Sequence, residues 1–175
     1  RDRRQRQMCI RDSTYTGKDL PFASKIQILN KYKSYLMFKK NFWIKKDDVK
    51  PINHKIKNFI YIVNLFRNVK YKWGGKTFKG IDCSGLVQII YNYNNKFFPR
   101  DTVDQIKFKK GLKSKKKFKK GDIVFWKGHV GICINSKKFI HAYGPRKKVL
   151  IMPINQTIKL IEKTAGLKVK KIFSI

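Results

Sequence analysis

The sequence predicts an α+β fold in which helices come first and an antiparallel sheet follows. Apolar residues recur at helical spacing in two segments, at about 55–67 and 84–93. From residue 122 on, the chain instead contains short apolar runs separated by turn residues, a pattern typical of consecutive strands. Because helices and strands are segregated along the chain rather than alternating, the pattern favours α+β over a doubly wound parallel sheet.

The first part of the chain contains two segments of different composition. Residues 1–13 are rich in arginine, lack apolar periodicity and resemble translated adaptor sequence, so we expect them to be foreign or disordered and give Cys9 no role. Residues 14–53 contain β-type runs at 25–29, 35–38 and 41–44. Forty residues are too few for an independent barrel, so we interpret 14–53 as part of a β domain.

The remaining elements complete a main domain that we assign to residues 54–175. A loop at 73–75 separates the two helices, and a short helix is expected at 102–107. Turns such as Lys127-Gly128 separate the strands that follow. The later expected elements are strands at 122–126, 130–135, 138–142 and 149–153, a helix at 156–163 and a strand at 167–173.

Lysine dominates the charge of the chain. The 175 residues carry 43 Lys and Arg against 10 Asp and Glu, a formal net charge of +33, and such a field attracts polyanions. The excess of lysine is spread along the whole chain among Ile, Asn, Phe and Tyr, residues that AT-rich coding sequences favour. The densest lysine run, at 115–120, lies in an expected loop. We therefore expect no obligate nucleic-acid partner. The longest apolar runs are too short for a membrane span, so none is expected either.

The three cysteines bear on the compartment. Cys9, Cys83 and Cys133 cannot all pair within one chain, and their spacing is not that of a zinc site. A reducing, cytoplasmic environment is therefore favoured. The chain begins with Arg1 and not with Met, so a periplasmic or secreted location stays open. We expect no cofactor and no metal.

One cysteine stands where a reactive thiol would be expected. The block Asp82-Cys83-Ser84-Gly85 precedes the apolar run of the second helix. A helix N-terminus lowers a thiol pKa because its unpaired N–H groups favour negative charge, and the thiolate is the nucleophilic form. A cysteine that only filled the core would more naturally lie inside the apolar run. Cys83 is therefore a candidate nucleophile.

Two of the three histidines supply the partners that such a nucleophile needs. His129 begins one expected strand and His141 lies near the end of the next. A tight connection at 135–136 makes these strands antiparallel neighbours, so the two imidazoles are expected on one face. A cysteine nucleophile needs a base, and the base works best when a third polar group orients it. Cys83, His129 and His141 can fill these three roles.

Other interpretations stay open at this point. His129 and His141 can simply cap strands, or they can ligate zinc together with Cys83 and Cys133. Cys133 follows His129 by four residues, which keeps both on one face of a strand. We expect His54, beside the domain boundary, on the surface, and Trp73 and Trp126 to serve packing.

Six short blocks follow one another in a fixed order along the chain. They are Tyr71-x-Trp-Gly-Gly, Asp82-Cys-Ser-Gly-Leu-Val, Pro99-Arg-Asp, Gly121-Asp-Ile-Val-Phe-Trp, His129-Val-Gly-Ile and Phe139-Ile-His-Ala. Each block alone is weak, but their order and spacing are highly specific. With these blocks, residues 55–153 resemble the NlpC family of bacterial cysteine peptidases (the NlpC/p-sixty group), which cleave peptidoglycan peptides.

The resemblance implies both a fold and a set of catalytic roles. The fold is papain-like, with the helix that bears the cysteine packed on an antiparallel sheet. Cys83 is implied as the nucleophile, His129 as the general base and His141 as the third member of the triad.

The resemblance also implies substrate-binding residues. In the family, a tyrosine, an aspartate and a serine of these motifs bind the free amine of an N-terminal L-alanine, and they fall here on Tyr71, Asp82 and Ser84. A carboxylate and a hydroxyl can satisfy an ammonium that is otherwise costly to bury. The alternative for Asp82 and Ser84 is helix N-capping, and the two roles are compatible.

Family members often carry bacterial SH3-like domains upstream, and residues 14–53 resemble the end of one. The implied architecture is a partial SH3-like β-barrel followed by an NlpC-type domain. The implied activity is a cysteine endopeptidase that cleaves the γ-D-glutamyl–diamino acid bond of muropeptides with a free N-terminal L-Ala. A non-catalytic cell-wall or nucleic-acid binding module, and an acyltransferase with the same triad, are the alternative functions. The truncated first module and the high lysine content depart from the family pattern.

Overall fold

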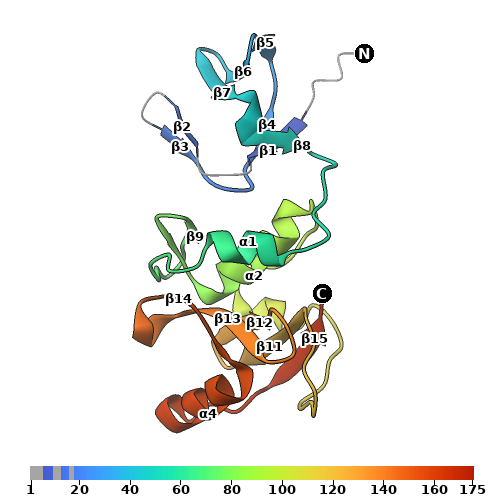
Figure 1. Ribbon diagram of the computed structural model, residues 1–175, viewed down its shortest axis with the longest axis vertical. Helices are drawn as coiled ribbons and strands as arrows, with labels where there is room; N and C mark the ends of the chain where they lie inside the picture. Colours follow the sequence, from blue (N-terminus) through green and yellow to red (C-terminus); the bar gives the residue numbers. More distant parts are fainter. Residues whose placement is uncertain (1–5, 10–12, 16–17) are drawn as a thin grey trace. The chain divides into compact units, whose positions relative to one another are not determined.

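The computed structural model describes residues 6–9, 13–15 and 18–175 (Figure 1). The chain divides into two compact units. The N-terminal unit takes in the described residues up to Lys57 together with Asn92–Lys96, and the second unit consists of Asn58–Tyr91 and Phe97–Ile175. Within the described part of the chain, every helix is too short or too polar to cross a membrane.

Short antiparallel strands form the N-terminal unit. Its three sheets have the strand orders β4-β1-β8, β5-β6-β7 and β2-β3. The elements are β1 (Arg6–Cys9), β2 (Ser13–Tyr15), β3 (Lys18–Leu20), β4 (Lys25–Gln27), β5 (Asn30–Tyr32), β6 (Tyr35–Lys39), β7 (Phe42–Lys45), a 3₁₀ turn (Lys46–Asp48) and β8 (Val49–Pro51). Five buried aliphatic side chains form its core: Ile26, Ile28, Leu36, Ile44 and Val49. The described strands do not close into a barrel, so the expected SH3-like barrel is not confirmed.

The N-terminal unit departs from the sequence-based expectation in two places. The single run expected at 25–29 ends at Gln27, and β5 pairs with β6 through a two-residue loop in which Lys33 has φ 50°. Residues with a left-handed backbone conformation suit two-residue hairpin loops, because this conformation matches the twist of the two strands. The expectation of disorder for 1–13 does not hold for Arg6–Cys9, which forms β1 and pairs with β4 and β8. Residues 1–5 and 10–12 lie outside the described residues.

A five-stranded antiparallel sheet lies at the centre of the second unit, which confirms the predicted α+β class. Its strand order is β14-β13-β12-β11-β15. Every residue of β11 is buried, so both faces of the sheet are covered there. Figure 1 shows α1 and α2 on one side of this sheet and α4 on the other. The strands are β11 (Asp122–Trp126), β12 (His129–Cys133), β13 (Lys138–Tyr143), β14 (Lys148–Pro153) and β15 (Lys171–Ser174), and the helices are α1 (Ile60–Leu65), α2 (Cys83–Tyr93), α3 (Thr102–Gln105) and α4 (Ile154–Ala165).

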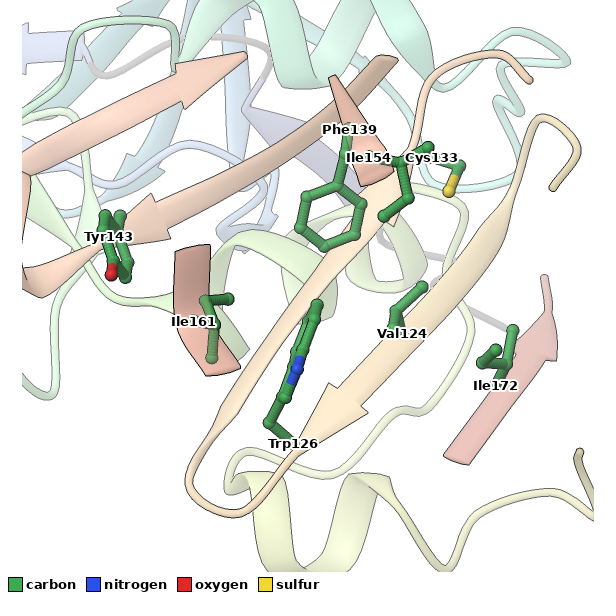
Figure 2. Close-up of a cluster of buried hydrophobic side chains, with 8 residues drawn as sticks. All are labelled: Val124, Trp126, Cys133, Phe139, Tyr143, Ile154, Ile161 and Ile172. Carbon is green, nitrogen blue, oxygen red and sulfur yellow. The ribbon is translucent and has the colours of Figure 1, made fainter. Parts of the chain in front are cut away.

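Alternate strand residues pack against α4 to form the core on that face. Val124 and Trp126 of β11 and Phe139 of β13 contact Ile154 and Ile161 of α4 in one buried cluster (Figure 2). The expected packing role of Trp126 is therefore confirmed, since its side chain is almost fully buried.

Gly131 of β12 is required by the close packing of this face. A Cβ at this position would lie 2.4 Å from the ring of Phe139 and 2.8 Å from the Cβ of His141. Only glycine leaves room for both neighbours.

The first helix of this unit is shorter than its apolar pattern indicates. We expected a helix over 55–67, but α1 covers Ile60–Leu65. The Asn58 side chain accepts a hydrogen bond from the first backbone N–H of α1 at 3.3 Å, so the helix starts just after it. Beyond the other end, Asn68 adopts φ 66° and its N–H donates to a carbonyl of β14, which turns the chain towards the sheet.

Asp122 ties the lysine-rich loop to the last strand. Its carboxylate is fully buried and accepts hydrogen bonds from the Lys115 ammonium (2.6 Å), the Lys119 backbone N–H (2.8 Å) and the Ser174 hydroxyl (2.7 Å). Burial alone would raise the pKa of Asp122, but these donors and the charge of Lys115 lower it overall. The carboxylate is thus a structural ion-pair partner inside the domain.

Candidate active site

Cys83 is the first residue of α2, and its thiol lies against the start of β12. The Asp82 carboxylate accepts a hydrogen bond from the Gly85 N–H at 2.7 Å, so Asp82 caps the helix. The Cys83 side chain is 5% exposed, and its Sγ lies 4.0 Å from the Gly128 carbonyl oxygen. The Val130 N–H also points at this sulfur. The thiol therefore contacts the backbone on both sides of His129.

The surroundings of Cys83 favour the neutral thiol over the thiolate. Burial raises the pKa of Cys83 to about 11, and the negative charge of Asp82 acts in the same direction. The backbone N–H groups of Val130, Ser84 and Cys83 itself oppose this shift without cancelling it. Helix position alone, which predicted a lowered pKa, is outweighed here by desolvation. The thiol consequently needs a base to become a nucleophile.

The two histidines lie together on adjacent strands, as the sequence predicts. His129 Nε2 and His141 Nδ1 are 2.9 Å apart, a hydrogen-bond distance. His141 is fully buried, and its ring stacks on Tyr143 at 4.9 Å between centroids. A hydrogen bond donated by His129 Nε2–H to His141 leaves His129 Nδ1 free to accept a proton.

Both imidazoles are neutral at pH 7. Burial lowers the pKa of His129 to about 4. Burial, together with the nearby charge of His129, lowers the pKa of His141 to about 3. A neutral imidazole is the form that can take a proton from the thiol. The pair can therefore act as a base and its orienting partner.

Arg100 organises the other flank of Cys83, and sequence reasoning assigned it no role. Its guanidinium lies 2.6 Å from Asp82 Oδ2 and 3.0 Å from Asp82 Oδ1, a bidentate ion pair. It also donates to the Ser84 hydroxyl at 2.8 Å. The only sequence signal was the position of Arg100 in one of the six ordered blocks.

The predicted substrate-binding residues are thus already engaged with protein groups. Asp82 also accepts hydrogen bonds from the Gly74 N–H at 2.8 Å and from the Ser84 hydroxyl at 3.2 Å. Its side chain is 8% exposed. Both the capping role and the cluster with Ser84 exist in the structure, and the binding of an amine there stays a prediction.

Tyr71 lies between this cluster and the β13–β14 connection. Burial raises the pKa of Tyr71 to about 12, and the charges of Cys83 and Asp82 add to that rise while Arg100 opposes it. The Tyr71 N–H donates to the Lys147 carbonyl oxygen at 2.8 Å, which fixes the backbone. The tyrosine is therefore a neutral hydroxyl donor close to the cysteine.

Comparison with known proteins agrees with this arrangement. The model of the NlpC/P60 family matches residues 68–164, which is more than half of the chain. The chain belongs to the NlpC/P60 family. The match spans Tyr71 and Arg100 as well as the cysteine and both histidines.

Two relatives in the family are named as peptidases. The gamma-D-glutamyl-L-lysine dipeptidyl-peptidase of Bacillus subtilis (strain 168) is 28% identical over 154 residues, which cover 80% of this chain and 52% of that protein. The murein DD-endopeptidase MepS/murein LD-carboxypeptidase of Escherichia coli (strain K12) is 35% identical over 97 residues, covering 52% of this chain and 50% of that protein. The chain spans about half the length of these relatives.

A solved structure shows the same fold. An NlpC/P60 family protein from Bacillus cereus ATCC 10987 superposes with a TM-score of 0.72 and 22% identity, over 97% of this chain and 59% of that chain. The α+β fold of the NlpC/P60 family is thereby shown for this chain.

The structure of this NlpC/P60 domain also bears on the expectations for Trp73, for a zinc site and for His54. The expectation that Trp73 serves packing is wrong, because this residue is 82% exposed. The described residues contain no group of three or more His, Cys, Asp or Glu that could hold a metal ion, so the zinc interpretation finds no support. His54 is half-buried in the N-terminal unit, edge-on to Tyr93.

A cavity of about 520 Å³ opens beside His129 in this family member. Tyr71 and the turn at Lys127-Gly128 line one part of it, and Tyr143–Arg146 and the end of α4 line the rest. The site therefore has space for a ligand on the side of the imidazole.

Proposed function

We propose that this chain is a cysteine endopeptidase that hydrolyses peptidoglycan stem peptides at the γ-D-glutamyl–diamino acid bond. The observation that carries the proposal is the His129–His141 hydrogen bond, together with the contacts of the Cys83 thiol with the backbone on both sides of His129. The name of the Bacillus subtilis relative supports the choice of bond. The substrate class is a muropeptide with a free N-terminal L-Ala.

The reaction begins with proton transfer from the thiol. His129 Nδ1 accepts the proton of Cys83, and the sulfur attacks the carbonyl carbon of the γ-glutamyl amide. Backbone N–H groups at the start of α2, including that of Cys83, stabilise the resulting oxyanion. His141 accepts a hydrogen bond from His129 Nε2–H and stabilises the imidazolium that forms.

The second half of the reaction returns the enzyme to its starting state. The C–N bond breaks as His129 gives its proton to the leaving amine nitrogen, which leaves a thioester on Cys83. Water, deprotonated by His129, adds to the thioester carbon. The carbon–sulfur bond then breaks, releasing the carboxylate product and the thiol.

The amino end of the substrate is proposed to bind at Tyr71, Asp82 and Ser84. An incoming ammonium would share the oxygens of Asp82 with Arg100, whose guanidinium neutralises that carboxylate. Hydrogen bonds to charged groups are strong enough to give this position selectivity for a free amine. We further propose that residues 14–53 belong to an SH3-like domain and that 54–175 form the peptidase domain. The small antiparallel sheets around one aliphatic core support the first assignment.

The test uses L-Ala-γ-D-Glu-diaminopimelate and L-Ala-γ-D-Glu-L-Lys with purified protein. We expect the wild-type protein to release L-Ala-γ-D-Glu, which mass spectrometry detects. The variant Cys83→Ala should release none. Cys133→Ala is the matched control, since Cys133 is also buried but lies in the core on the α4 face. Peptide cleavage by the Cys83→Ala variant would refute the assignment of Cys83 as the nucleophile. Transfer of the acyl group to an added amine instead of water would identify an acyltransferase.

A further inference from the structure

The reaction scheme does not yet use the cavity beside His129. Its volume of about 520 Å³ is within the range of sites for small ligands. Two basic side chains, Lys127 and Arg146, line it together with apolar side chains of the α4 region, among them Leu160 and Leu167. Its described walls include no carboxylate side chain.

The position of the cavity relates it to one half of the substrate. Of the residues proposed to hold the amino end, Asp82 and Ser84 flank Cys83 at the start of α2 and are not part of the cavity wall, whereas Tyr71 also lines the cavity and would lie between the two halves of the substrate. His129, which gives the proton to the leaving amine, forms part of the cavity wall. Because a general acid must reach the leaving nitrogen, the leaving half of the substrate lies on the imidazole side.

Backbone hydrogen bonds hold the two basic residues on short turns. Lys127 occupies the two-residue turn of the β11–β12 hairpin, in which Trp126 pairs with His129. Arg146 ends the 3₁₀ turn Gly144–Arg146, which is closed by the bond from the Lys147 N–H to the Gly144 carbonyl oxygen at 2.9 Å. Both side chains are exposed, so they meet a ligand without first breaking an internal ion pair.

We propose that this cavity binds the diamino acid on the leaving side of the scissile bond, and that Arg146 and Lys127 recognise its free α-carboxylate. A guanidinium and an ammonium complement a carboxylate, and the apolar wall near Leu160 and Leu167 suits the methylene stem of the side chain. The proposal rests on the proposed function. Its consequence is a preference for tripeptides over longer or amidated stems, in which that carboxylate is blocked.

The experiment compares L-Ala-γ-D-Glu-L-Lys with the same peptide ending in a carboxamide, at one ionic strength. Wild-type protein is expected to cleave the acid with a kcat/KM about tenfold above that of the amide, mainly through KM, as expected for one lost charge-assisted hydrogen bond. In Lys127→Gln/Arg146→Gln the ratio should fall close to one while cleavage of the amide persists. Lys159→Gln/Lys163→Gln removes the same charge from exposed positions of α4 outside the cavity wall and should keep the wild-type ratio.

Each outcome has one meaning. Equal cleavage of acid and amide by the wild type overturns the carboxylate site, whatever the variants do. A ratio that survives in Lys127→Gln/Arg146→Gln, or in the single variant Arg146→Gln if the double variant does not fold, also overturns it. Cleavage of neither peptide by the wild type instead refutes the proposed function.

Discussion

Protonation at the histidine pair decides how the candidate site responds to pH. His129 has a pKa of about 4 because it is buried, whereas the ordinary value is 6.5. Above pH 4 the imidazole is therefore neutral and able to act as a base. In the unfolded chain the same histidine takes up its proton from about pH 6.5 downwards, so folding stability also falls as the pH drops below that value.

The first prediction concerns the acid limb of the pH profile. We expect kcat/KM for the tripeptide to stay nearly constant from neutral pH down to about 5 and to fall with an apparent pKa near 4, because only there does His129 become protonated. The measurement is initial rate against pH, with intrinsic fluorescence at each pH to confirm that the protein stays folded. An acid limb near 6.5 in folded protein would contradict the buried, neutral base.

The second prediction concerns Arg100, which neutralises the buried carboxylate next to Cys83. Arg100→Ala leaves Asp82 without its ion-pair partner, so we expect a loss of about 1–3 kcal/mol in the free energy of unfolding together with reduced activity. Urea denaturation measures the stability. Arg67→Ala is the matched control because Arg67 is an exposed arginine of the same unit. Equal stability of the two variants would show that the Asp82–Arg100 pair contributes little.

At the scale of elements, Gly131 lets β12 and β13 approach closely enough for the histidine pair to form. Gly131→Ala places a methyl group against Phe139 and His141, so we expect a loss of about 1–3 kcal/mol from overpacking and weaker catalysis. Phe139→Leu removes ring atoms from the same space. The double variant Gly131→Ala/Phe139→Leu should therefore lose less free energy of unfolding than the sum of the losses in the two single variants. Thermal unfolding measures these losses. Simple additivity would argue against a shared clash.

The sequence predicted the elements of the second unit well because their signals are local. The strand expected at 122–126 agrees with β11, and the helix expected at 84–93 is α2, which begins one residue earlier at Cys83. The closeness of His129 and His141 followed from the tight turn between their strands. Leu167 and Val169 were expected in the last strand, but they precede β15 and pack beside the core cluster instead.

The features that the sequence did not predict depend on contacts between distant residues. β1 pairs with β8, about forty residues further along the chain, and no local pattern encodes such a partner. Arg100 reaches Asp82 across eighteen residues from a turn, where periodicity carries no information. The raised pKa of Cys83 likewise depends on burial by other elements rather than on its place at the start of a helix.

At the scale of the whole molecule, the charge of +33 should act on substrate encounter. The diaminopimelate tripeptide carries one net negative charge at neutral pH, whereas the lysine tripeptide is net neutral. We therefore expect kcat/KM for the first to fall several-fold as ionic strength rises from about 0.02 to about 0.3 M, with kcat unchanged, and that for the second to change little. Parallel salt titrations measure this difference. Identical salt dependence for both peptides would exclude electrostatic attraction of the substrate.

Because the buried carboxylate of Asp122 pairs with Lys115, the lysines of this loop should differ in how well they tolerate substitution. Lys116 and Lys117 are exposed, so mutation can exchange them for other polar residues at little cost. Replacement of Lys115 would strand a negative charge inside the domain, next to the strand that ends the sheet. Nucleotide composition alone could generate the lysine run at 115–120. Within it, selection should therefore conserve Lys115 much more strongly than Lys116 or Lys117.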